Sequence, residues 1–256
     1  MSAFRLSKWY LDCVTGSGDA SIAYTGVLEW RFLHFGFSSL LESTGTQVRQ
    51  QNMLRDQHDP RTERDSISWK MPKLGIDALW RADAAAVHQT IFECEEGAID
   101  WHCIMPRARA EFGDRRGLGY VEHLTMTIPP WKIPIRQLRW GRFLTADDWI
   151  VWIDWDGEFS RRIVYRNGVL LAVSSLEDCK IELASRESLT MSNSIVLREG
   201  PLGSTALASI PGVENTFPGR LLRVNECKWR SRARLAHADG RTSDGWAIHE
   251  RVVWPQ

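Results

Sequence analysis

The sequence lacks an excess of charge of either sign. Its 256 residues contain 32 Lys and Arg against 32 Asp and Glu, so the formal net charge is zero. Binding to nucleic acid or to an anionic membrane surface depends on a surplus of basic residues. The one basic stripe, Lys228–Arg234, is typical of the solvated face of an outer strand. We therefore expect no nucleic-acid partner.

Long apolar runs and paired cysteines are also missing. No segment approaches the roughly 18 apolar residues of a membrane span, and the N-terminus has no apolar signal core. The five cysteines never form a C-x-x-C pair, and the seven histidines have no metal-ligand spacing. P-loop, G-x-S-x-G and dinucleotide-binding motifs are absent as well. We expect a cytoplasmic protein with free thiols, no membrane span, no metal and no cofactor.

Helical periodicity is scarce, and alternation with a period of two takes its place. Along Cys227–Leu235, apolar or small side chains alternate with Lys and Arg, which predicts a strand with one dry and one solvated side. Trp246–Trp254 follows a turn signal and is its expected partner. Asn167-Gly168 is a strong hairpin signal. Trp149–Trp155 is almost wholly apolar, as in a strand that is covered on both faces.

Strands at this spacing, joined by Gly, Asn and Asp turns, are typical of antiparallel barrels and sandwiches. The polar stretch Ser39–Asp65 is expected to be a long loop with at most one short helix. A domain boundary is expected at Leu144–Asp148, because a proline-rich segment ends before it and a new run of strands begins after it. The fold class we predict is all-β, with two antiparallel β-barrel-like domains at 1–143 and 144–256.

Tryptophan is unusually frequent. There are 13 Trp against 9 Phe and 4 Tyr, and five of the 13 lie between Trp131 and Trp155. Each ring buries about 200 Å², so most of them belong to the core, and three or four remain for a pocket. A neutral chain with such a region suits an uncharged, apolar ligand.

The least generic segment, Gly117–Leu124, contains a candidate acid. Tyr120 and Glu122 are two residues apart and share one face of a strand, whereas His123 points to the other face. Desolvation raises the pKa of a carboxylic acid, so a glutamate facing a tryptophan-lined cavity can act as a general acid near neutral pH. We predict Glu122 and Tyr120 as catalytic residues. The structural alternative is an ion pair of Glu122 with an arginine of the segment that follows.

The residues that we predict for ligand binding are aromatic or polar and lie in or beside these segments. They are Trp9, His123, Trp131, Trp140, Arg142, Trp152 and Asp154.

Three short islands carry a resemblance to a known group. They are Trp9-Tyr10-Leu11-Asp12, then Gly117-Leu118-Gly119-Tyr120-Val121-Glu122-His123, then Trp140-Gly141-Arg142. With them the sequence resembles the lipocalin-like group of bacterial carotenoid 1,2-hydratases (hydroxyneurosporene synthases) and AttH-type proteins. That group has Asp where this chain has Glu122, and Asn-Trp-Gly where this chain has Leu124-Thr125-Met126. The resemblance implies two consecutive lipocalin-like, calycin-type units and hydratase-like chemistry.

Three functions from different classes fit these observations. The first is a cofactor-independent enzyme that hydrates, cyclises or isomerises a hydrophobic small molecule, isoprenoid or polyketide-like, with a buried carboxylic acid in a Trp-lined cavity. The second is a non-catalytic binding protein for a hydrophobic ligand. The third is a carbohydrate-active β protein, which grips sugars with tryptophan and paired carboxylates. We place the enzyme first. A homodimer is compatible with the sequence, which does not decide the oligomeric state.

Overall fold

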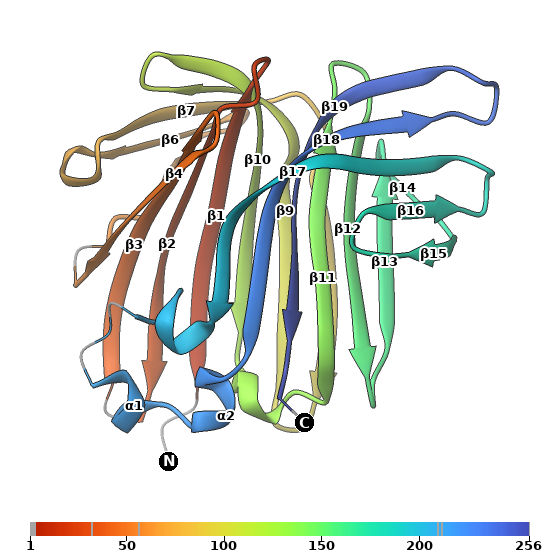
Figure 1. The fold of residues 1–256 in the computed structure, drawn as a ribbon. Helices are drawn as coiled ribbons and strands as arrows, with labels where there is room; N and C mark the ends of the chain where they lie inside the picture. Colours follow the sequence, from red (N-terminus) through yellow and green to blue (C-terminus); the bar gives the residue numbers. More distant parts are fainter. Residues whose placement is uncertain (1–3, 32, 56, 209, 211, 256) are drawn as a thin grey trace. The chain divides into compact units, whose positions relative to one another are not determined.

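The chain divides into two compact units, each built around one antiparallel sheet. The computed structural model describes residues 4–31, 33–55, 57–208, 210 and 212–255. The units are Met1–Ile133 and Pro134–Gln256, and each has its own sheet (Figure 1). The predicted fold class, all-β with two lipocalin-like units, is confirmed.

The first unit holds a sheet of ten strands among the described residues. Its order is β4-β3-β2-β1-β10-β9-β7-β6-β5, with β8 paired to β9. The elements are β1 (Arg5–Thr15), β2 (Ala20–Trp30), β3 (Leu33–Thr44), β4 (Gln47–Leu54), β5 (Arg61–Thr62), β6 (Ser66–Met71), β7 (Ile76–Ala82), β8 (Val87–Cys94), β9 (Gly97–Phe112), β10 (Arg115–Met126) and the 3₁₀ turns η1 (Pro72–Leu74) and η2 (Pro130–Lys132).

The second unit holds a sheet of nine strands over its described part, in the order β14-β13-β12-β11-β19-β18-β17-β16-β15. None of the described helices has the length and apolar character needed to cross a membrane. The elements are β11 (Ile135–Leu144), β12 (Trp149–Gly157), β13 (Arg161–Arg166), β14 (Val169–Leu170), β15 (Val173–Leu176), β16 (Lys180–Leu183), β17 (Ser188–Pro201), β18 (Asn225–Ala236), β19 (Thr242–Val253), η3 (Leu202–Ser204), α1 (Val213–Thr216) and α2 (Gly219–Leu222).

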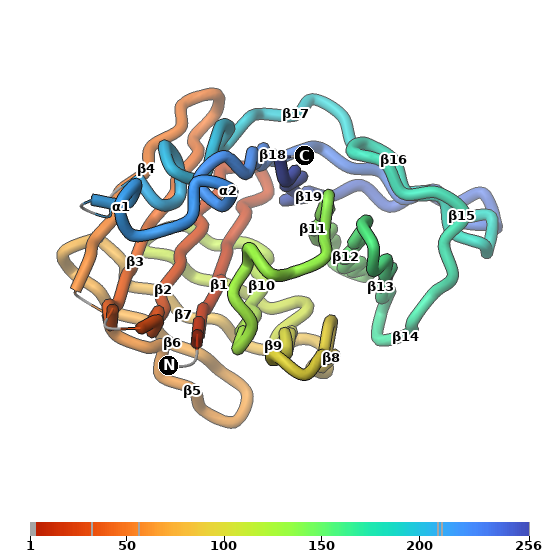
Figure 2. Tube along the Cα trace, turned by 90° about the horizontal axis from the view of Figure 1, so that it is seen from below, coloured from red at the N-terminus to blue at the C-terminus, as the bar shows by residue number. Residues whose placement is uncertain are grey.

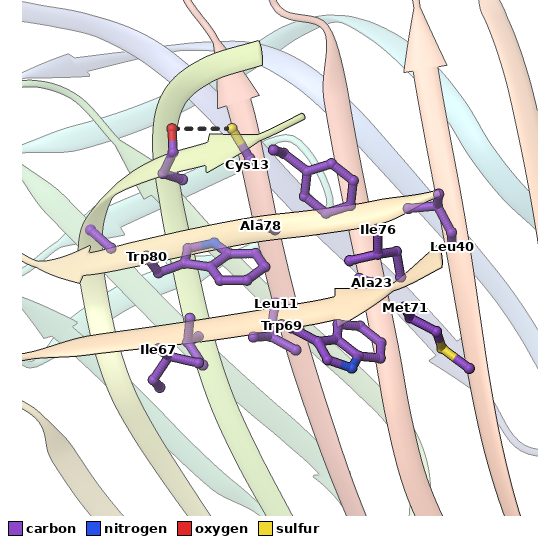
Figure 3. Close-up of a cluster of buried hydrophobic side chains, with 14 of the residues drawn as sticks. Leu11, Cys13, Ala23, Leu40, Ile67, Trp69, Met71, Ile76, Ala78 and Trp80 are labelled. Atoms are coloured by element: carbon purple, nitrogen blue, oxygen red, sulfur yellow. Dashed lines mark hydrogen bonds between the residues drawn. The ribbon is translucent and has the colours of Figure 1, made fainter. Parts of the chain in front are cut away.

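The sheet of the first unit curls around an apolar core. In Figure 2 this part of the chain curves from β4 through β1 and β10 to β9. Trp69 of β6 and Trp80 of β7 lie across from Leu11 of β1 in this core, as Figure 3 shows. Because neighbours on a strand point to opposite faces, Tyr10 and Asp12 lie on the face of β1 that looks away from the core.

The second unit has a separate core. Phe143 of β11, Trp152 of β12 and Leu235 of β18 are members of it, and all three are buried. The first seven residues of β12, Trp149–Trp155, are all buried. The predicted strand covered on both faces is therefore confirmed.

The prediction of a long loop at Ser39–Asp65 is wrong. Most of this range belongs to β3 and β4, which pair in register from Phe37 with Leu54 to Thr44 with Gln47. The turn between them has Gly45 in the left-handed region, at a φ of 57°. β4 is the edge strand of the sheet. An edge strand with few buried residues needs no apolar alternation, which is why the pattern missed it.

The strand expected at Cys227–Leu235 is confirmed as β18, but its basic side is not fully solvated. Lys228 and Arg230 are buried, at 2% and 6% exposure. Lys228 forms an ion pair with Glu250 of β19, and its Nζ lies 5.0 Å from the ring centre of Trp140. Charge pairing and cation–π contact with neighbouring strands make this burial possible.

Candidate functional site

Two tyrosine–carboxylate pairs face each other on the neighbouring strands β1 and β10. The antiparallel register places Tyr10 opposite Glu122 and Asp12 opposite Tyr120. The Tyr10 hydroxyl donates to Oδ2 of Asp12 over 2.9 Å, and the Tyr120 hydroxyl donates to Oε2 of Glu122 over 2.6 Å. Each strand thus contributes one Tyr-x-acid motif, and the two motifs run in opposite directions. We call these four residues the tyrosine–carboxylate cluster.

Glycine lets β10 approach β1 closely enough for this pairing. A Cβ atom on Gly119 would lie 2.5 Å from the carbonyl oxygen of Asp12 and 2.8 Å from the indole of Trp80. That same carbonyl accepts a hydrogen bond of 2.6 Å from Nε1 of Trp80. The backbone beside the Asp12 carboxylate is therefore fixed from two sides. The second glycine of the Gly-x-Gly that precedes Tyr120 is therefore required because a larger residue would not fit between the strands.

Aromatic rings surround the tyrosine–carboxylate cluster. Nε1 of Trp101 on β9 donates to Oε2 of Glu122 over 2.6 Å. The ring of Tyr10 meets the ring of Tyr24 at 5.2 Å and the ring of Tyr120 at 5.8 Å, both edge-on. Asp12 and Tyr120 are fully buried and Glu122 is 7% exposed. Buried carboxyl groups need such donors, because the loss of water is otherwise uncompensated.

The electrostatics keep the neutral donors of the cluster protonated. Burial raises the pKa of the Tyr120 hydroxyl well above its usual range, and the nearby Cys103 and Glu122 raise it further. Burial likewise raises the pKa of the Cys103 thiol. Tyr120 is therefore a hydrogen-bond donor at neutral pH. Tyr120 and Trp101 both donate to Oε2 of Glu122.

Trp9 and His123, two predicted ligand-binding residues, lie together on the opposite face of the same strands. They are register partners, with ring centres 4.7 Å apart at an angle of 38°. The Oγ of Ser7 is 2.8 Å from Nε2 of His123. Burial lowers the pKa of His123. The prediction that His123 points away from Tyr120 and Glu122 agrees with this register.

The second unit contains a similar trio. Trp229 of β18 stacks on His249 of β19, with 5.1 Å between ring centres, and the Oγ of Ser231 is 2.8 Å from Nε2 of His249. Burial lowers the pKa of His249 to about 4. Each unit therefore holds a neutral, serine-bonded imidazole against an indole. The predicted site residues include Trp9 and His123 of the first trio and no member of the second.

The other predicted residues of the second unit separate onto the two faces of its sheet. Gly141 is opposite Trp152, whereas Trp140 is opposite Ile153 and Arg142 is opposite Val151. Trp152 belongs to the core, so Trp140 and Arg142 point away from it. Nη1 of the fully buried Arg142 donates to the carbonyl oxygen of Trp246 over 2.9 Å.

Asp154 shares the face of Trp152, where it accepts hydrogen bonds from Arg139 and Arg162. Trp131 lies in η2, in edge-on contact with Phe4 and Trp30 at 5.8 Å and 4.6 Å between ring centres.

Sequence inspection assigned no site role to Tyr10, Asp12 and Trp101, although the first two stood in a quoted motif. The signal that could have found them is the repeated Tyr-x-acid motif, at Tyr10-Leu-Asp12 and again at Tyr120-Val-Glu122. Trp101 could not be found this way, because its contact with Glu122 depends on the register between β9 and β10, which contains a bulge. Among the described residues, no group of three or more His, Cys, Asp or Glu side chains is arranged to hold a metal ion.

No protein-family model and no curated protein matches the chain. Solved structures do. CghA in complex with Sch210972 matches with a TM-score of 0.57 at 10% identity, over 98% of this chain and 88% of that chain. Kievitone hydratase from Nectria haematococca matches with a TM-score of 0.57 at 10% identity, over 98% and 89%. A protein of Nitrosomonas europaea assigned to AttH matches with a TM-score of 0.56 at 7% identity, over 96% and 92%. At these identities the chain shares the fold of these proteins over nearly its whole length.

Proposed function

We propose that this protein is a hydratase-type enzyme that adds water to, or removes it from, an apolar small molecule by acid–base catalysis. The observation that carries the proposal is the tyrosine–carboxylate cluster, with two buried carboxyl groups held by tyrosines on adjacent strands. The fold agrees with it, since one structure of the same fold is a kievitone hydratase. AttH-type proteins, which the sequence motifs resemble, share that fold as well.

In this proposal Glu122 is the general acid and Asp12 the general base. A proton of the Glu122 carboxyl group moves to one carbon of a substrate double bond. Water attacks the other carbon, a C–O bond forms, and the water proton passes to Asp12. Tyr120 donates to Oε2 of Glu122 and stabilises the carboxylate that remains. Proton exchange with solvent restores both groups, and the reverse sequence removes water.

The surroundings of the cluster favour an apolar substrate, and we propose an isoprenoid or polyketide-like molecule. Trp101 and Tyr24 are buried beside the carboxyl groups. The faces of indole and phenol rings stabilise a cationic centre, which forms when an isolated alkene is protonated. Holding a flexible chain in a reactive conformation contributes further to the rate.

The variant Glu122→Gln tests the proposal. Glutamine keeps an oxygen that can accept from Tyr120 and Trp101, but it cannot deliver a proton, so we expect turnover to fall about 100-fold or more. The assay incubates the protein with a panel of isoprenoid and polyketide alkenes and alcohols in ¹⁸O-labelled water, and mass spectrometry follows incorporation of the label.

The matched control is Glu111→Gln on β9, an exposed carboxylate of the same unit that pairs with Arg81. It should retain wild-type turnover. Wild-type turnover by Glu122→Gln would remove Glu122 from the mechanism. If the wild type binds a ligand tightly without incorporating the label, the protein is a binding protein. In that case the hydrogen bonds of the cluster have a structural role only.

A further inference from the structure

A pocket of about 600 Å³ lies within the second unit, and its lining comes mainly from β11, β12, β13 and β15. Its lining includes Arg139, Arg161 and Arg162, but only two aspartates, Asp154 and Asp156. The pocket thus carries one positive charge more than negative charges, on a chain whose net charge is zero. An excess of arginine in a concave site attracts anions.

Aspartate side chains orient two of these arginines, Arg139 and Arg162. Asp154, which is 6% exposed, accepts from Nη1 of Arg139 over 3.4 Å and from Nε of Arg162 over 2.8 Å. Asp178 accepts from Nε of Arg139 over 2.8 Å and from Nη1 of Arg251 over 2.6 Å. Arg139 is therefore held by two aspartates from different directions. Its guanidinium does not have to be ordered when a ligand arrives, which lowers the cost of binding.

Arg162 has donors to spare. Its Nε serves Asp154, and within the described part of the chain its two terminal nitrogens donate no hydrogen bond to another protein group. The side chain is 40% exposed, so these donors are open to a ligand. Two parallel N–H groups on a planar guanidinium match the two oxygens of a carboxylate.

The lining also has an apolar part. Leu176 and Trp155 contribute to the pocket through the 5% of each residue that stays exposed. Asp156 is engaged with Arg136, which lies 3.6 Å away. A ligand that satisfies both parts has an anionic head and an apolar body.

We propose that this pocket is a second binding site, which takes an organic carboxylate with an apolar chain, with Arg162 as its main recognition residue. The site lies in the second unit, whereas the tyrosine–carboxylate cluster lies in the first. The inference therefore does not depend on the proposed hydratase activity.

Calorimetric titration of the full chain with sodium octanoate tests the proposal, with octan-1-ol and sodium acetate as comparison ligands. We expect saturable octanoate binding that weakens at high salt. Each comparison ligand should bind at least about tenfold more weakly, because it lacks either the anionic head or the apolar body. Arg162→Gln should weaken octanoate binding by about tenfold or more. Arg162→Lys, which keeps the charge but loses the paired donors, should weaken it by less.

The matched control is Arg234→Gln, an exposed arginine of the same unit that pairs with Asp244 outside the pocket. It should bind octanoate like the wild type. The proposal is overturned if octanoate does not bind, if octan-1-ol binds as tightly, or if the Arg162 variants bind like Arg234→Gln. Asp154 retains Arg139 in all of these variants, so the fold is expected to persist, and circular dichroism checks it.

Discussion

At the residue scale, His249 shows how burial sets the protonation of a side chain. The imidazole is 3% exposed and stacked on Trp229, and burial lowers its pKa from 6.5 to about 4. Gly141 makes this arrangement possible, because a Cβ atom there would lie 2.7 Å from Cβ of His249 and 2.3 Å from the ring of Trp152. A glycine on one strand thus determines which large rings fit on its two neighbours.

The depressed pKa makes His249 a source of acid lability. Between about pH 6.5 and pH 4 the unfolded chain binds a proton at this residue and the folded chain does not. Stability is therefore complete above pH 6.5 and falls as the pH is lowered through this window, by about 2 kcal/mol at pH 5.

Urea unfolding at pH 7.5 and pH 5 measures this effect. Wild-type protein should lose about 2 kcal/mol more between the two pH values than His249→Gln does, because glutamine does not titrate. Equal losses in the two proteins would show that His249 is protonated in the folded state at pH 5.

At the scale of strands and turns, the sequence indicated most of what lies on a single strand. Alternation located β18 and β19, the apolar run located β12, and Asn167-Gly168 located the turn before β14, with both residues at positive φ. Tyr120 and Glu122 were placed on one face for the same reason. Each of these features depends on neighbouring residues in the chain, so the sequence pattern can predict it.

The hairpin of β18 with β19 was predicted, but pairing between strands far apart in the chain was beyond the sequence. The partnership of Tyr10 with Glu122, and the contact of Trp101 with the same carboxyl group, depend on register across residues far apart in the chain. Burial of Lys228 depends on Glu250 of the next strand. The charged residues around Lys228 in the sequence predicted that its side chain is exposed to solvent. In the sheet, Glu250 lies beside it and forms an ion pair with it.

Arg166 links several turns of the second unit and gives a prediction at this scale. Its guanidinium binds Asp148, which precedes β12, and Glu187, which precedes β17. It also lies 3.0 Å from Nδ1 of His237 in the β18–β19 turn. Removing it leaves the buried Asp148 and the partly buried Glu187 without their arginine, so Arg166→Gln should cost about 3 kcal/mol.

Denaturant unfolding of Arg166→Gln checks this cost against Arg234→Gln, whose ion pair with Asp244 is exposed and contributes little to stability. Similar stabilities of the two variants would mean that the Arg166 contacts are weak in solution.

At the scale of the whole molecule, the two sheets bury separate cores. Ile67 is fully buried in the first core, beside Trp69 and Trp80. Ile67→Ala should destabilise the first unit by about 2–5 kcal/mol, because it removes buried methyl groups and leaves a cavity. We expect amide hydrogen exchange to accelerate in strands β1–β10 and to stay near the wild-type rate in β11–β19. Equal acceleration in both sheets would show that the chain opens as one cooperative unit.

The two Tyr-x-acid motifs run in opposite directions, and this has a stereochemical consequence. Asp12 and Glu122 project from the same face of adjacent strands. A flat alkene lying against this face would receive hydrogen and hydroxyl on one side, so the proposed hydration is a syn addition. With Glu122 as the acid and Asp12 as the base, the carbon next to Glu122 receives hydrogen and the carbon next to Asp12 receives the hydroxyl group. The arrangement therefore fixes the face of the double bond that reacts, and the direction in which the substrate binds decides which carbon receives the oxygen.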